Sequence, residues 1–220
     1  MWAIFCSALE KGQCEIDQNI GNKNDTRRGI TALAYLESNN KSVVNEIDHF
    51  LNQVQQIEPE QFYHPINELH LTILSIITCI AGFKLTDINP TEYARIFYQA
   101  FNGIDPIEIE FKGVTASSSC VVIQGFPVGS SLDLLRDRLR KHFKASGLRS
   151  SIDSRYKITT AHVSVIRFHT EIKDKDKLKI LFKKYRNYSF GTVKFTKFEL
   201  VFNNWYQNLS ITEKLANYSI

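Results

Sequence analysis

Residues 68–76, ELHLTILSI, carry the pattern on which the fold prediction depends, because β-forming residues here surround a single histidine. Successive side chains of a strand point to opposite faces, so His70 and Thr72 share one face. Leu71 and Ile73 lie on the other face, against the neighbouring layer of the fold. The stretch therefore predicts a strand that presents an imidazole and a hydroxyl side by side.

The same pattern recurs in residues 159–168, TTAHVSVIRF, where His162 and Ser164 take the places of the earlier histidine and hydroxyl. The two histidines are 162 − 70 = 92 positions apart, which leaves room for about half a domain between them. The other four histidines of the chain lack this context. A single histidine in an apolar strand is more often a core residue, but the repetition favours a functional pair whose side chains point into one groove.

Further helices and strands are expected around these two segments. Strands are expected at residues 30–36, 107–115, 120–126 and 192–202, and helices at residues 40–54, 90–101, 131–146 and 174–185. In the last strand the apolar phase shifts between Phe195 and Phe198, which indicates a β-bulge. The order of elements predicts two strand-helix-strand units, each with one histidine strand, beside a shared cleft.

The composition indicates a globular protein with a substantial core. The chain has 220 residues, of which 43% are hydrophobic and 12% aromatic, so disorder is a poor interpretation. The net charge of +4 favours an anionic ligand but falls well short of what a duplex-DNA-binding protein carries. Four cysteines stand apart without CxxC spacing, which indicates reduced thiols in a cytoplasmic protein, expected to be a monomer.

The apolar segments of the chain do not indicate a membrane protein. The apolar start, MWAIFCSAL, lacks the basic flank and cleavage site of a signal peptide, and the longest apolar stretch, residues 69–83, is too short to span a bilayer. Residues 10–28 are polar and show no periodicity. Residues 1–28 are therefore expected to form a flexible N-terminal extension, and residues 29–220 a single bilobal domain.

Two histidines on matching strands suit acid–base chemistry. Imidazole titrates near neutral pH, so one ring can take a proton from a nucleophile while the other gives a proton to a leaving oxygen. The hydroxyls of Thr72 and Ser164 can donate hydrogen bonds to the charged oxygens of a phosphate. The sequence has no HExxH motif, P-loop or carboxylate cluster near either histidine, and this scheme requires no metal or cofactor.

The tetrads at residues 70–73 (HLTI) and 162–165 (HVSV) resemble the duplicated His-apolar-Thr/Ser-apolar signature of the two-histidine phosphoesterases. That group includes bacterial 2′-5′ RNA ligase-like proteins and cyclic nucleotide phosphodiesterases, and the resemblance covers roughly residues 29–202. It implies an α+β fold with antiparallel sheets in two lobes around a central groove. It also implies metal-independent cleavage of a cyclic phosphate or a related nucleotide diester, with His70, Thr72, His162 and Ser164 as the catalytic residues.

Side chains just upstream of the tetrads are candidates for substrate binding. Tyr63 and Tyr156 could stack on a base and Arg155 could hold a phosphate, although packing at the edge of a loop explains them equally well. His64 lies close to His70 in the sequence, but a zinc site is improbable because further ligands are absent.

Three other features have ordinary structural interpretations. Trp205 and Tyr206 resemble a hairpin turn in which packing is favoured over ligand stacking. Arg167 has the parity of Val163 and Val165, so its side chain is expected to point away from the histidine face. The basic helix that begins at residue 131 could line an RNA path, but a solvated face is favoured.

Two function classes remain after these considerations. The leading hypothesis is a metal-independent phosphodiesterase acting on a cyclic phosphate, a cyclic nucleotide or a 2′-5′-linked nucleotide. The alternative is a module that binds a nucleotide or an RNA end in the same groove without turnover. Both tetrads are intact, which favours the enzyme; a purely structural protein would leave two matching polar patterns unexplained.

Overall fold

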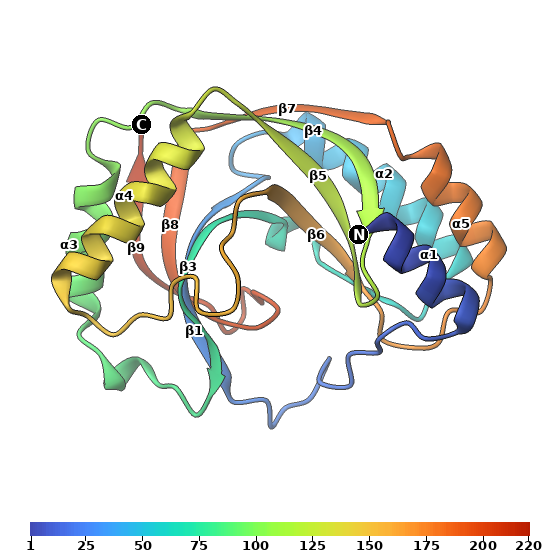
Figure 1. Cartoon of the computed structure of the whole chain (residues 1–220), viewed down its shortest axis with the longest axis horizontal. Helices are drawn as coiled ribbons and strands as arrows, with labels where there is room; N and C mark the ends of the chain where they lie inside the picture. The colour runs from blue at the N-terminus through green and yellow to red at the C-terminus, as the bar shows by residue number, and fades with distance from the viewer.

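Two antiparallel sheets form the two lobes of the molecule, which a computed structural model describes over residues 1–220 (Figure 1). Sheet A has the strand order β3-β1-β8-β9, and sheet B has the order β2-β6-β5-β4-β7. The strands of sheet A are β1 (Arg27–Tyr35), β3 (His70–Ala81), β8 (Lys197–Asn204) and β9 (Glu213–Ser219). Those of sheet B are β2 (Phe62–Tyr63), β4 (Ile107–Ala116), β5 (Cys120–Val128), β6 (Ala161–Arg167) and β7 (Ser189–Phe195). The α+β class with antiparallel sheets is therefore confirmed.

Five helices cover the outer faces of the two sheets (Figure 1). They are α1 (Trp2–Lys11), α2 (Lys41–Ile57), α3 (Pro90–Phe101), α4 (Ser131–Ser146) and α5 (Lys175–Lys184), with short 3₁₀ turns at Ile66–Glu68 and Leu85–Asp87. Helices α3 and α4 pack against each other and against sheet A, whereas α2 packs against β7 of sheet B and against α5. The buried apolar side chains form one continuous core.

The strands of the two sequence halves are interleaved between the sheets. In sheet A, β1 pairs with β3 on one side and with β8 on the other, and β9 pairs with β8. Strands β8 and β9 come from the second half of the chain, whereas β1 and β3 come from the first. Strand β2, from the first half, pairs instead with β6 in sheet B. The two strand-helix-strand units expected from the order of elements therefore do not correspond to the two lobes. Each histidine strand nevertheless lies in its own sheet, β3 in sheet A and β6 in sheet B.

The single strand predicted at residues 192–202 is wrong, because the chain changes sheets inside it. Strand β7 pairs Phe195 with Ile107 in sheet B, and after Thr196 the chain pairs Lys197 with Ser219 in sheet A. The apolar phase shift in this region therefore marks a crossing between the two sheets rather than a β-bulge. Phe195 is buried on one side of the crossing and Phe198 on the other.

Helix α1 was not predicted, and it brings the start of the folded structure well ahead of Gly29. Phe5 is buried and its ring lies 6.0 Å from that of Phe168 and 5.7 Å from that of Phe182. The helix ends where Gly12 adopts the left-handed conformation. The signal was weak because the helix is short and no side chain caps its N-terminus.

Local signals placed the start of α2 and the end of α4, although α2 continues to Ile57, beyond the expected end at residue 54. The Asn40 side chain caps α2 by accepting hydrogen bonds from the backbone N–H groups of Ser42 and Val43. Gly147 ends α4 in the left-handed conformation. The four cysteines form no disulfide, and none of the helices has the length and apolar character needed to cross a bilayer.

Candidate active site

The two sequence motifs meet in one pocket between the sheets. The pocket has a volume of about 300 Å³, and its walls include His70 and Thr72 from β3 and His162 and Ser164 from β6. Strands β3 and β6 contact each other although they belong to different sheets. The alternation of side chains along each strand thus directs both imidazoles and both hydroxyls into one space.

A backbone carbonyl fixes the proton of His70. The ring nitrogen Nδ1 lies 2.7 Å from the carbonyl oxygen of Glu68, and because a carbonyl only accepts, Nδ1 must donate. Nε2 of the neutral ring is therefore the proton acceptor. Burial lowers the pKa of His70 to about 4, so the ring is neutral at pH 7.

Residues far from Glu68 in the sequence hold its side chain in place. Its side chain accepts hydrogen bonds from the backbone N–H of Leu209 at 2.9 Å and from the Asn208 amide at 3.1 Å. The turn after β8 therefore holds the carbonyl that orients the His70 ring. An imidazole held in this way keeps one tautomer and one direction in the pocket.

His162 has a similar electrostatic environment. Burial lowers its pKa, and the nearby positive charge of Arg136 lowers it further. Both histidines are thus held in the uncharged form before a ligand enters. An anionic phosphate between them would favour the charged form of each ring, which is the change that acid–base catalysis needs.

Arg136, a buried residue of helix α4, connects the backbones of the two histidine strands. Its side chain is 1% exposed, and its Nε donates to the carbonyl of Ile73 at 2.9 Å. Its Nη2 donates to the carbonyl of Thr160, just before β6, at 2.9 Å and to that of Thr72 at 3.3 Å. The guanidinium thus connects the backbone of β3 to the start of β6.

The solvated face predicted for helix α4 is wrong at this position. Arg136 follows Leu132 by four residues and precedes Leu139 by three, so it lies on the same helical face as the buried leucines. The spacing alone could have identified it as buried. Arg140, four residues further along the same face, is half-buried, whereas Lys141 is exposed.

Arg167 lines the pocket, contrary to the prediction from strand parity. The pairing of β5 with β6 shifts here, because Val121 pairs with Ile166 whereas Val122 pairs with Ser164. Val165 is therefore an extra residue in β6, and this bulge reverses the alternation. The Arg167 guanidinium consequently points to the same side as His162 and adds a positive charge to the pocket.

Trp205 and Tyr206 also line the pocket, so packing alone does not describe them. The guanidinium groups of Arg27, Arg155 and Arg167 lie 5.2, 5.2 and 5.6 Å from the centre of the Trp205 ring. These are cation–π distances. One end of the pocket is thus an aromatic wall surrounded by positive charge.

Of the three substrate-binding candidates, two reach the pocket and one does not. Arg155 and Tyr156 lie at its rim, and Tyr156 is 70% exposed. Tyr63 is not part of the wall: its hydroxyl donates to the carbonyl of Glu58 at 2.8 Å. It pairs with the buried Ile166 across β2 and β6, so both side chains lie on the face away from the pocket.

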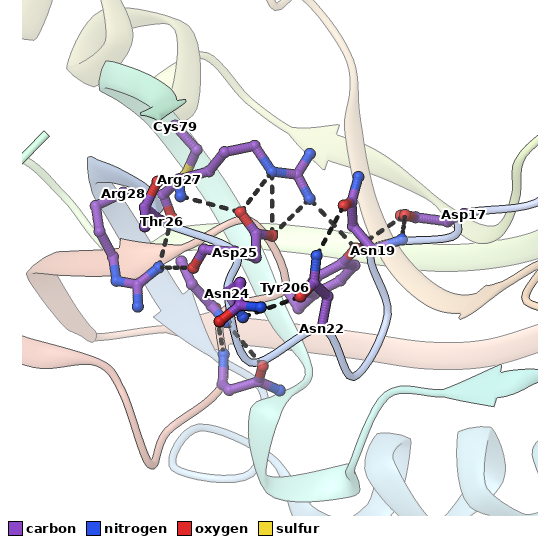
Figure 2. A network of polar contacts seen from close by, with 12 residues as sticks. Asp17, Asn19, Asn22, Asn24, Asp25, Thr26, Arg27, Arg28, Cys79 and Tyr206 are labelled. Atoms are coloured by element: carbon purple, nitrogen blue, oxygen red, sulfur yellow. Dashed lines mark hydrogen bonds and ion pairs between the residues drawn. The ribbon is translucent and has the colours of Figure 1, made fainter. Parts of the chain in front are cut away.

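The segment between α1 and β1 supports this end of the pocket (Figure 2). The Asp25 carboxylate binds Arg27 at 2.7 Å, and Arg27 in turn donates to the Tyr206 hydroxyl at 3.3 Å. Tyr206 donates its own proton to Asp17 at 2.9 Å. Although the segment has no regular structure, it therefore fixes Tyr206 of the aromatic wall and Arg27, whose guanidinium lies against the Trp205 ring. No group of three or more His, Cys, Asp or Glu side chains is arranged to hold a metal ion.

Comparison with known structures supports the assignment of the fold. The protein TT0787 of Thermus thermophilus has a TM-score of 0.61 and 13% identity, with 87% of this chain and 97% of that chain covered. E. coli LigT complexed with ATP has a TM-score of 0.54 and 12% identity, with 88% and 98% covered. The protein ATU0111 of Agrobacterium tumefaciens has a TM-score of 0.57 and 10% identity, with 92% and 95% covered. At these identities the likeness concerns the fold alone.

The sequence itself gives the family. No curated protein sequence matches the chain. A family model described as the AKAP7 2′5′ RNA ligase-like domain matches residues 33–208, a range that includes both histidine tetrads and the Trp205 turn. This match agrees with the resemblance of the tetrads to those of two-histidine phosphoesterases. The chain therefore belongs to the AKAP7 2′5′ RNA ligase-like domain family, within the two-histidine phosphoesterase superfamily.

Proposed function

We propose that the protein is a metal-independent phosphodiesterase that cleaves a cyclic phosphate, a cyclic nucleotide or a 2′-5′-linked nucleotide. The observation that carries this proposal is the meeting of both histidines and both motif hydroxyls in one pocket. The Arg167 guanidinium in the same wall supplies a positive charge for the phosphate.

The reaction uses both imidazoles in one displacement, one as the base and the other as the acid. One neutral ring takes a proton from water while the water oxygen forms a bond to phosphorus; the bond from phosphorus to the leaving oxygen breaks, and the other ring, protonated, gives that oxygen its proton. Thr72 and Ser164 donate hydrogen bonds to the non-bridging oxygens, where negative charge concentrates. Bound phosphate raises the pKa of the imidazoles, which allows one of them to carry the required proton.

The rim of the pocket suits the nucleoside part of such a substrate. Trp205 and Tyr156 offer aromatic faces for a base, and Arg155 forms no ion pair that would compete with a phosphate. E. coli LigT, which shares the fold, has been crystallised with ATP, with NADP⁺ and with 3′-AMP. These complexes motivate the choice of nucleotides as test substrates.

The function can be tested directly with the purified protein. Incubation with a panel of 2′,3′-cyclic, 3′,5′-cyclic and 2′-5′-linked nucleotides in EDTA is expected to yield hydrolysis products from at least one class, separated by chromatography. The chelator should have no effect, since the reaction as proposed uses no metal ion. Activity that disappears with EDTA and returns with a divalent ion would contradict the mechanism. Tight binding without products would favour the non-catalytic alternative.

The pH dependence follows from the lowered pKa values of the two histidines. Both rings are uncharged in the free protein at pH 7, but the reaction needs one of them protonated. As the pH falls, kcat/KM is therefore expected to rise until the second ring also becomes protonated. The bell-shaped profile should have its maximum below about 6.5, the ordinary pKa of imidazole. Steady-state kinetics at several pH values, with circular dichroism to verify folding, would show this; a maximum above pH 7 would contradict it.

A further inference from the structure

His64 is buried against the pocket without a hydrogen-bond partner for either ring nitrogen. Its side chain is 4% exposed and forms part of the pocket wall. The backbone is fixed by a hydrogen bond from its N–H to the carbonyl of Val165, and the ring packs edge-on against Phe62 at 5.0 Å. A buried polar group without a partner lowers stability, so its presence needs an explanation.

Three other buried polar atoms of the same pocket also have no partner: Nε of Arg167, Oδ1 of Asn203 and Oε1 of Gln207. The amide of Asn203 donates through its nitrogen to the carbonyl of Asn204 at 2.9 Å, which identifies Oδ1 as a free acceptor. Gln207 contacts the Thr31 hydroxyl through its amide nitrogen at 3.4 Å. Unsatisfied polar groups thus gather in one wall of one pocket, which is the arrangement expected of a binding site.

Contacts connect these groups to the surroundings of both histidine tetrads. The backbone N–H of His64 bonds to the carbonyl of Val165, and the preceding Tyr63 pairs with Ile166, so His64 lies close to Arg167 of β6. Gln207 directly precedes Asn208, whose side chain holds Glu68 and thereby the carbonyl that orients His70. The wall therefore borders the same space as the two tetrads, next to a phosphate held between the histidines.

The chemistry of the wall selects the kind of ligand group. Asn203 and Gln207 offer acceptors, Arg167 offers a donor, and a neutral imidazole offers one donor and one acceptor. Burial lowers the pKa of His64 to about 3, so the ring stays neutral and takes no part in proton transfer near pH 7. A wall that binds an anion would present donors only. A mixed wall fits an uncharged group that both donates and accepts, which describes the free hydroxyls of a ribose.

We propose that His64, Asn203 and Gln207 form a subsite for the ribose hydroxyls of the nucleotide, so that the pocket distinguishes ribonucleotides from deoxyribonucleotides. This inference rests on the proposed function in that the pocket takes a nucleotide. It goes further by naming the residues that recognise the sugar. None of these three residues belongs to a histidine tetrad.

Binding of AMP and of its 2′-deoxy and 3′-deoxy analogues, measured by calorimetry, tests the subsite without requiring turnover. The protein is expected to bind AMP about tenfold more tightly than at least one deoxy analogue, since a hydrogen bond of this kind is worth about that factor. In the variants His64→Phe and Gln207→Leu the ratio should fall close to one. If the unaltered protein discriminated between AMP and its analogues but cleaved none of the nucleotides in the panel, the phosphodiesterase function would be rejected and the ribose subsite would remain supported.

Thermal unfolding of the same variants separates recognition from a structural role. Because both ring nitrogens of His64 are unpartnered, His64→Phe should leave the melting temperature unchanged or raise it, and Gln207→Leu, which loses only the long contact to Thr31, should lower it little. The control is Gln61→Leu, because Gln61 is 7% exposed and Gln207 is 8% exposed, but the Gln61 amide has partners in Thr170 and His169. This control should melt earlier and keep the discrimination between AMP and its analogues.

Several outcomes would overturn the proposal. They are no binding of AMP at millimolar concentration, and equal affinity for AMP and both deoxy analogues. A loss of stability in Gln207→Leu as large as that in Gln61→Leu would also overturn it, because the amide would then have a structural role.

Discussion

Replacement of His70 or His162 by alanine is expected to reduce kcat/KM by about 10²–10⁴-fold on any diester that the protein cleaves. Each ring moves one of the two protons in the proposed reaction, so neither can substitute for the other. Steady-state kinetics of the two single variants and the double variant would measure the effect. Because the rings act as a unit, the double variant should lose little more than either single variant.

The matched control for this experiment is His49→Ala, since His49 is an exposed histidine on α2 outside the pocket. It should retain the activity of the unaltered protein. Circular dichroism should show that all of the variants fold. Near-normal turnover in either single pocket variant would rule out the paired mechanism.

The variant Arg136→Met is expected to lower the free energy of unfolding by about 2–4 kcal/mol. Methionine fills similar space but donates no hydrogen bond, so the carbonyls of Ile73, Thr72 and Thr160 lose their buried donor. Urea denaturation followed by circular dichroism would give the difference. Activity should also fall, because these bonds connect the backbones of the two histidine strands.

The comparison for that experiment lies on the same helix. Lys141 is exposed, so Lys141→Met should change stability by no more than a few tenths of a kcal/mol. If Arg136→Met unfolded at the same urea concentration as this control, the bridge between β3 and β6 would have no part in stability.

Features that depend on neighbouring residues were predictable from the sequence. Alternation along residues 68–76 and 159–168 indicated both histidine strands and the faces on which His70 and His162 lie. Helix α4 likewise followed from its periodic leucines and from Gly147. In these cases the period of side-chain directions within one element determines the answer.

Features that depend on pairing between distant strands were not predictable in this way. The direction of Arg167 follows from the bulge at Val165, which exists only in the register of β6 against β5. The place of Trp205 and His64 in the pocket depends on how the two sheets meet. No window of sequence around any of these residues contains the information that decides its position.

The interleaving of strands between the sheets also bears on how the protein is made. Strand β1 pairs Arg28 with Asn204, a separation of 204 − 28 = 176 positions. Contacts this distant in the chain slow folding, because a long loop must close before they form. A nascent chain that has been synthesised only as far as α5 already contains His70 and His162. Its strand β1, however, cannot yet pair with β8. The pocket is therefore completed only after β8 and the turn that follows it have left the ribosome.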